Sequence, residues 1–158
     1  MKNSANREWI LRASNPDPVE GSSEIDVMFD HDQFLLYVEA KLGSDISMKT
    51  KYDPQRNQIV RNIDCLIENA GERMPLFWML ARDEAPDRTY VQLMTRYKAD
   101  PCLLARELPH RQQSTLDAVA QNLTILLWSD FGELVCGPGW DAESSAVKQE
   151  LERRILQV

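Results

Sequence analysis

The chain has 158 residues, of which 43% are apolar and 27% charged. This length and composition are typical of one folded domain, and they argue against two full domains or a disordered chain. No apolar run approaches the ~20 residues of a membrane-spanning helix, and the first residues lack the apolar stretch of a signal peptide, so we expect a cytoplasmic protein without a membrane partner. Cys65, Cys102 and Cys136 are odd in number and far apart, which argues against structural disulfides and a zinc site.

The net charge of −7 argues against a nucleic-acid partner, because binding a polyanion relies on Lys and Arg. The charge is unevenly distributed, however. Residues 41–61 hold five positive side chains against two negative ones, a local charge of +3, so the rest of the chain carries −10. The five positive residues are Lys41, Lys49, Lys51, Arg56 and Arg61. Chance also produces such an excess in a window of this length, so charge alone leaves a docking surface and a random cluster equally open.

The first part of the chain predicts a strand, a loop and a hairpin. Residues 8–13 (EWILRA) are typical of a short strand, and the Pro, Gly, Ser and Asp residues of 15–23 indicate a loop. Segments 24–29 (EIDVMF) and 33–42 (QFLLYVEAKL) predict two antiparallel strands joined by a tight turn.

The hydrophobic pattern also predicts the register of this hairpin, because a slip of one residue would move every side chain to the other face. The predicted pairs, which make one face wholly apolar, are Ile25 with Val38, Val27 with Leu36, and Phe29 with Phe34. The opposite face starts apolar and turns ionic, and on it Asp26 is predicted to lie diagonal to Glu39.

A helix and a buried strand follow, as in an alternating α/β chain. Asp53 and Pro54 are typical of an N-cap and a first helical position, and Gly71 is typical of a helix end. The helix between them carries an apolar stripe at helical spacing, formed by Ile59, Ile63, Leu66, Ile67 and Ala70. Residues 75–81 (PLFWMLA) predict a central buried strand.

The second half of the chain predicts four helices and one strand. The helices are predicted over residues 89–97, 103–108, 114–122 and 141–156. Ser114 is a candidate N-cap, residues 124–128 (TILLW) predict a buried strand, and Gly137-Pro138-Gly139 indicates a turn. The predicted fold is therefore α/β, with a mixed central sheet flanked by helices.

Acidic residues gather at one end of the predicted hairpin. Glu24, Asp26 and Glu39 converge there, although like charges opposite one another destabilise a sheet. Lys41 extends from the same strand face, two residues beyond Glu39. Two carboxylates can share a hard cation such as Mg²⁺, and a nearby ammonium can hold or deprotonate a water that attacks a phosphate, which suits phosphodiester hydrolysis. The alternative is an ordinary solvated strand end whose charges contribute little.

Asp26, twelve intervening residues and then Glu39-Ala40-Lys41 resemble the PD-(D/E)XK motif of restriction-endonuclease-like nucleases. The likeness continues into residues 52–61 (YDPQRNQIVR), where Gln58 matches a glutamine that faces the active site in many of these enzymes. It covers roughly residues 8–83, in which hairpin, helix and apolar strand arrive in the family's order. Ile25 stands where the motif has proline, which is a common variation.

The resemblance implies a single domain over residues 1–158 with the restriction-endonuclease-like α/β fold. It implies that the carboxylates of Asp26 and Glu39 and the backbone carbonyl of Ala40 bind Mg²⁺ or Mn²⁺. Lys41 would then be the catalytic lysine, and Gln58 would orient substrate or water. The expected activity is divalent-metal-dependent hydrolysis of DNA, and the expected partner is DNA.

The resemblance leaves alternatives open. The family usually begins with a helix that carries an acidic residue, so either this helix is missing, or Glu8 or Glu24 replaces the acid, or the activity is weak. The fold could also be kept without turnover, as a DNA-binding or protein-assembly module, and the acidic remainder of the chain favours this alternative. A homodimer, or a partner subunit that brings DNA to the site, fits the same charge balance.

Two further expectations follow from the nuclease interpretation. Lys49, Lys51 and Arg56 are expected to position the phosphate backbone, while Lys41 acts on the scissile phosphate. Because repulsion between carboxylates destabilises a metal-free site, Glu39→Gln is expected to leave the protein at least as stable.

Overall fold

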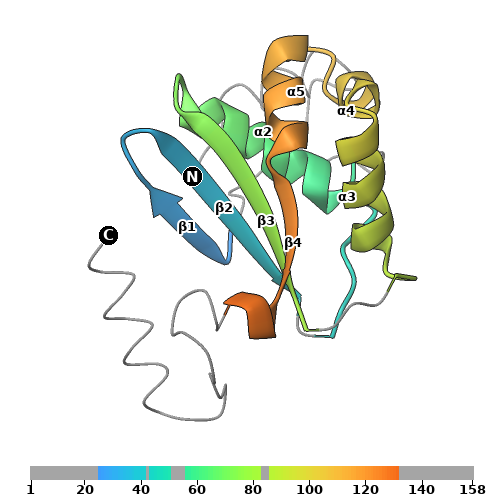
Figure 1. The fold of residues 1–158 in the computed structure, drawn as a ribbon. Coiled ribbons are helices and arrows are strands. Elements are labelled where there is room, and N and C mark those ends of the chain that lie inside the picture. Colours follow the sequence, from blue (N-terminus) through green and yellow to red (C-terminus); the bar gives the residue numbers. More distant parts are fainter. Residues whose placement is uncertain (1–24, 42, 51–55, 83–85, 132–158) are drawn as a thin grey trace.

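The structure is a computed structural model that describes residues 25–41, 43–50, 56–82 and 86–131 (Figure 1). Its four-stranded sheet has the order β1-β2-β3-β4. The strands are β1 (Val27–Asp30), β2 (Phe34–Lys41), β3 (Met74–Ala81) and β4 (Leu123–Leu127). The helices are α2 (Gln58–Ala70), α3 (Thr89–Ala99), α4 (Cys102–Glu107) and α5 (Gln113–Gln121). The prediction of a mixed sheet flanked by helices is confirmed.

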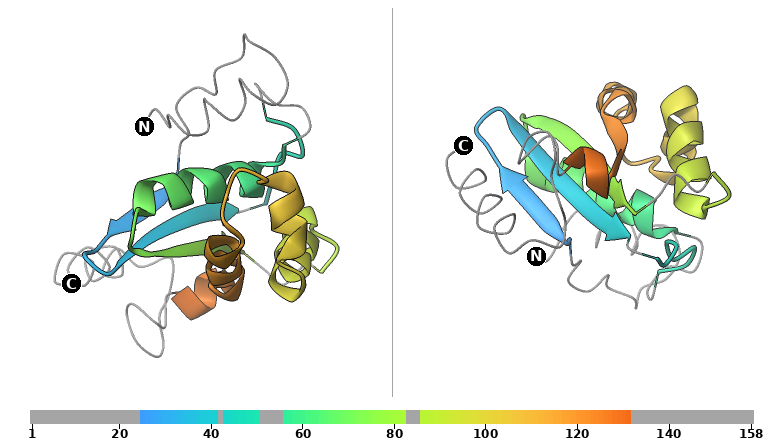
Figure 2. Two further views of the ribbon diagram at one scale, coloured as in Figure 1. Left: turned by 90° about the horizontal axis from the view of Figure 1, so that it is seen from above. Right: turned by 60° about the horizontal axis from the view of Figure 1, so that its bottom comes forward.

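The strand directions follow from the connections. β1 and β2 are antiparallel and joined by a short turn, whereas β2, β3 and β4 run parallel to one another. Parallel neighbours need a long crossover, which α2 supplies between β2 and β3 by lying along the sheet (Figure 2). β3 pairs with β2 on one side and β4 on the other, so it is an inner strand, as its continuous apolar sequence predicts. The strand predicted over 8–13, the turn at 137–139 and the helix predicted over 141–156 lie outside the described residues.

The predicted hairpin register is wrong by two residues. Val27 pairs with Val38 and Phe29 with Leu36. The turn lies one residue later along the chain than predicted: the His31 N–H donates to the Phe34 carbonyl at 3.0 Å, and the two rings stack with their centroids 4.7 Å apart. Because side chains alternate with a period of two, this shift keeps each side chain on its predicted face, and continuing the register places Asp26 level with Glu39 instead of diagonal to it.

The start of α2 also differs from its prediction. The helix begins at Gln58, and its N-cap is Asn57, whose side-chain oxygen accepts from the Val60 N–H at 3.0 Å. Asp53 and Pro54, the predicted first residues, lie outside the described residues. The predicted end at Gly71 is confirmed, and this glycine adopts a φ of 60°, which other residues avoid. The N-cap position of α5 is likewise not the predicted Ser114, which lies inside the helix, but Gln112, whose side chain makes no capping hydrogen bond.

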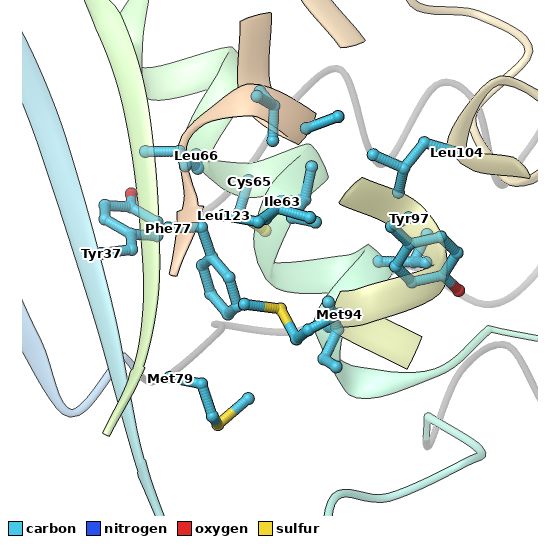
Figure 3. Packing of buried hydrophobic residues seen from close by; sticks show 14 of the residues in the cluster. Tyr37, Ile63, Cys65, Leu66, Phe77, Met79, Met94, Tyr97, Leu104 and Leu123 are labelled. Carbon is cyan, nitrogen blue, oxygen red and sulfur yellow. The ribbon is translucent and has the colours of Figure 1, made fainter. Parts of the chain in front are cut away.

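The helices cover the face of the sheet on which Glu39 lies. Tyr37 of β2 and Phe77 and Met79 of β3 belong to one buried cluster with residues of all four helices (Figure 3). The helical members include Ile59, Ile63, Leu66, Met94, Tyr97, Leu104, Leu116 and Val119. The opposite face holds a second, smaller cluster around Leu36, Val38 and Leu80. Because alternate residues of β2 face the helices, Glu39 and Lys41 continue the row of Leu35 and Tyr37 and end at the boundary of the main core.

No helix among the residues that the structure describes is both long and apolar enough to cross a membrane.

Candidate active site

Glu39 lies at the carboxyl end of β2 and is only 4% exposed. Its Oε1 accepts from the Gln58 side-chain amide at 2.6 Å and forms an ion pair with the Lys41 Nζ at 2.9 Å. Its Oε2 accepts from the Asn62 side-chain amide at 3.0 Å. A buried carboxylate needs such donors, because an uncompensated charge in this place would cost several kcal/mol. The structure thus brings three of the predicted site residues together: Glu39, Lys41 and Gln58.

Gln58 links this carboxylate to the loop that follows β2. Its side-chain oxygen accepts from the Lys41 Nζ at 3.2 Å and from the Ser47 N–H at 3.3 Å. Its own backbone N–H donates to the Ser47 carbonyl at 2.9 Å. Gln58 is the first residue of α2, so this one residue connects the start of the helix to the end of β2 and to the loop. The Gln58 side chain therefore faces Glu39 and Lys41.

Asp26 reaches the same end of the sheet from the other strand. It is exposed and lies just before the β1 ladder, and its Oδ2 accepts from the Ala40 N–H at 2.7 Å. Backbone carbonyls of successive β2 residues point alternately toward β1 and toward β3. The Phe34 carbonyl accepts from the His31 N–H on the β1 side, and the Lys41 carbonyl accepts from the Arg82 N–H beside β3. Ala40 lies an even number of positions after Phe34, so the Ala40 carbonyl points toward the β1 side, as the Ala40 N–H does. The Asp26 carboxylate and the Ala40 carbonyl therefore share one edge of β2, the edge that faces β1.

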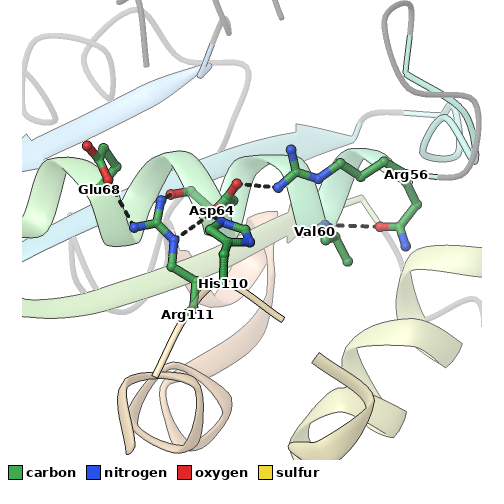
Figure 4. Close-up of polar contacts among 7 residues, drawn as sticks. Arg56, Val60, Asp64, Glu68, His110 and Arg111 are labelled. Atoms are coloured by element: carbon green, nitrogen blue, oxygen red, sulfur yellow. Dashed lines mark hydrogen bonds and ion pairs between the residues drawn. The ribbon is translucent and has the colours of Figure 1, made fainter. Parts of the chain in front are cut away.

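One predicted docking residue is placed elsewhere. Arg56 is only 2% exposed and forms an ion pair with Asp64, which is fully buried (Figure 4). It therefore cannot contact a phosphate backbone, and its assignment to DNA docking is wrong. Lys49 is exposed, as docking requires. Lys51 lies outside the described residues, as do Glu8 and Glu24, the candidates for the acidic residue that the family carries on its first helix.

Asp64 is the centre of a second polar cluster, which joins α2 to the segment between α4 and α5. Its Oδ1 lies 2.9 Å from the His110 Nε2 and 2.6 Å from the Arg111 Nε. Burial alone would raise the pKa of Asp64, but the hydrogen bond with His110 and the charges of Arg56 and Arg111 outweigh burial and lower it. Asp64 is therefore ionised, and side chains of the protein itself stabilise its charge.

Asn62 is the residue of the site that sequence reasoning missed. It is 1% exposed and stands one helical turn after Gln58, so both amides reach Glu39 from the same side of α2. The signal was present in the sequence, because a polar residue between Ile59 and Ile63 interrupts the predicted apolar stripe. A buried amide in that position needs a partner, and the facing strand offers Glu39.

The oxygen atoms predicted to bind a metal can be compared with the ligands that Mg²⁺ prefers. Mg²⁺ is commonly held by one or two carboxylates and keeps several waters, so Asp26, Glu39 and the Ala40 carbonyl fit it in kind. Within the described ranges, however, no group of three or more His, Cys, Asp or Glu side chains is arranged to hold a metal ion. Both oxygens of Glu39 also accept hydrogen bonds from the protein. A metal that bound Glu39 would have to replace one of these donors.

Comparison of the chain with known protein families finds no matching family model, and comparisons with curated proteins and with solved structures find no match either.

Proposed function

We propose that this chain is a divalent-metal-dependent nuclease of restriction-endonuclease-like fold that hydrolyses phosphodiester bonds of DNA. The observation that carries the proposal is the meeting of Glu39, Lys41 and Gln58 at the carboxyl end of β2, beside the edge that Asp26 and Ala40 share. In open α/β sheets, ligands commonly bind outside the carboxyl ends of the strands. The end of β2 is such a place, and it brings acids, a lysine and an amide together there.

Each residue has a role that its contacts support. The Lys41 ammonium contacts both Glu39 and Gln58, and 11% of the Lys41 side chain is exposed, so the ammonium is held in place at the border of the core. There it can orient a water molecule and stabilise charge on a phosphate oxygen. Gln58 fixes the ammonium through its oxygen. Bound at Asp26, Glu39 and the Ala40 carbonyl, Mg²⁺ or Mn²⁺ would polarise the phosphate and acidify a bound water.

The second candidate function is a DNA-binding or protein-assembly module without turnover. The observation that favours it is that Glu39 has hydrogen-bond donors on both oxygens, as a purely structural buried carboxylate does. The two candidates differ in one respect that can be measured. A nuclease must bind a cation and cleave, whereas a binding module needs neither.

Cleavage of labelled single- and double-stranded DNA in Mg²⁺, in Mn²⁺ and in EDTA tests the proposal. We expect cleavage with either metal, none in EDTA, and none with Asp26→Ala. Asp32→Ala is the matched control, because Asp32 is an exposed acid of the hairpin turn and should retain full activity. DNA binding without cleavage in either metal would favour the binding module, and equal activity of Asp26→Ala and Asp32→Ala would remove Asp26 from the site.

A further inference from the structure

We propose that Asn62 is a positioning residue that anchors Glu39 Oε2 and thereby leaves Oε1 as the oxygen that serves a ligand. The inference rests on the proposed function for the identity of that ligand, and on the geometry alone for the anchoring. The Asn62 amide donates to Oε2 at 3.0 Å, while Oε1 meets the Lys41 ammonium and the Gln58 amide. The two oxygens of one carboxylate therefore have different surroundings.

The two amides differ in how freely they can move. Asn62 is 1% exposed and stands on α2 between Ile59 and Ile63, both fully buried in the main core, so its short side chain has little room to turn. Gln58 is partly exposed at the first position of the helix and has one more rotatable bond. A ligand that approached Glu39 could replace the Gln58 amide on Oε1, whereas the Asn62 amide would stay in place on Oε2.

Anchoring of this kind has a function in a charged site. A carboxylate held at one oxygen keeps its plane and its distance from Lys41 when the partner of the other oxygen changes. Groups that orient a metal-binding or catalytic carboxylate in this way typically contribute 10- to 100-fold in metal affinity or activity. Asn62 would act through Glu39 and would not touch the substrate.

A double-mutant cycle on unfolding tests the anchoring without any reference to catalysis. The variants are Asn62→Ala, Lys41→Met and the double variant, each unfolded with urea. Each substitution changes the unfolding equilibrium constant by some factor. If Asn62 holds Glu39 in position beside Lys41, the factor for the double variant should differ from the product of the two single factors by at least about threefold, because both side chains act through Glu39. The control cycle pairs Lys41→Met with Asn69→Ala. Asn69 is on the same helix but donates to the Tyr37 hydroxyl, so in this cycle the factor for the double variant should equal the product of the two single factors.

A kinetic measurement then tests the role in the proposed reaction. At a temperature where all variants are folded by circular dichroism, Asn62→Ala should lower kcat by about tenfold or more with a much smaller change in KM, while Asn69→Ala keeps both constants. Asn62→Asp, which has the same size but no donor and a like charge, should be no better than Asn62→Ala.

The outcomes separate the two proposals. Simple multiplication in the Asn62–Lys41 cycle would overturn the anchoring, and an unchanged kcat in folded Asn62→Ala would overturn the role of Asn62 as a positioning residue for the reaction. A coupled cycle in a wild-type protein that cleaves no DNA would support the anchoring of Glu39 and reject the nuclease. A coupled cycle together with the loss in kcat would support both.

Discussion

The Glu39 side chain carries a negative charge in a place that is almost closed to water. At the level of sequence this charge is a source of repulsion, and Glu39→Gln is expected to do no harm. The structure surrounds the carboxylate with one ammonium and two amide donors instead, which reverses that expectation. The difference arises because Asn62 and Gln58 come from the helix after the hairpin, and the strand pattern alone does not show which residues of that helix face Glu39.

Glu39→Gln should therefore destabilise the protein. A glutamine in this place must direct its own NH₂ group at one of the existing donors, and it also loses the ion pair with Lys41. Leaving buried donors unsatisfied costs about 1–3 kcal/mol, and we expect a loss in that range in urea unfolding without added metal. Gln33→Glu in the exposed hairpin turn is a control for a change of charge alone and should stay within about 0.5 kcal/mol. An unchanged stability of Glu39→Gln would mean that the network contributes nothing.

Among the elements, α2 shows what the sequence predicts well and what it does not. Its apolar stripe and its end at Gly71 are local properties, and both are confirmed. The start of α2, in contrast, depends on residues that are distant in sequence. The Asn57 side-chain amide donates to the Tyr97 hydroxyl at 3.0 Å and to Glu107 Oε2 at 3.2 Å, which lie 40 and 50 residues further along the chain. The pair Asp53-Pro54 has the local signature of a helix start, but tertiary partners select Asn57.

Substitution of Asn57 can separate these contributions. Asn57→Ala should lose both the cap and the tertiary contacts, about 2 kcal/mol or more, whereas Asn57→Ser keeps a capping oxygen and should recover about 1 kcal/mol of the loss. Burial, followed by the neighbouring Glu107, raises the pKa of Tyr97, so its hydroxyl stays protonated as a donor to Glu107 in both variants. Equal losses in Ala and Ser, measured by chemical unfolding, would show that the cap contributes nothing.

The cluster around Asp64 predicts how stability depends on pH. The pKa of Asp64 is lowered from its ordinary value of 3.8, so the folded state favours the ionised form. Its contribution to stability is therefore complete above about pH 5 and is lost as the pH falls through the lowered pKa. Asp64→Asn leaves Arg56 buried without its counter-charge and should cost about 3–5 kcal/mol at pH 7. Unfolding free energies of wild type and variant should approach each other below about pH 4, and a constant difference down to pH 2.5 would contradict this.

For the molecule as a whole, the sequence predicts the α/β fold class and the meeting of three side chains at the end of β2 more accurately than it predicts which charges are exposed on the surface. Glu39, Lys41 and Gln58 meet because hairpin, helix and strand follow in an order that leaves few alternatives. Which positive residues are exposed depends on how the rest of the chain packs. Arg56 lies in the basic window by sequence, but it is buried against Asp64 in the fold.

Lys49 and Arg56 should therefore respond differently to loss of charge. Lys49→Gln should weaken DNA binding for every sequence and lower the salt dependence by about one unit of slope, because one phosphate contact is lost. Arg56→Gln should instead lower stability, and whatever remains folded should bind DNA normally. Fluorescence anisotropy titrations at several salt concentrations measure both effects. A normal salt slope in Lys49→Gln would place the docking surface elsewhere.

The most direct test of the proposed active site is single-turnover cleavage of DNA by wild type and Lys41→Ala in Mn²⁺, with the DNA affinity of each measured in Ca²⁺ or without metal. Because the Lys41 ammonium is proposed to stabilise charge that develops in the transition state, the variant should lose at least about a hundredfold in cleavage rate and change little in affinity. Equal cleavage rates for the two proteins, or a wild-type protein that binds Mn²⁺ and DNA without cutting, would contradict the assignment of this site as a nuclease.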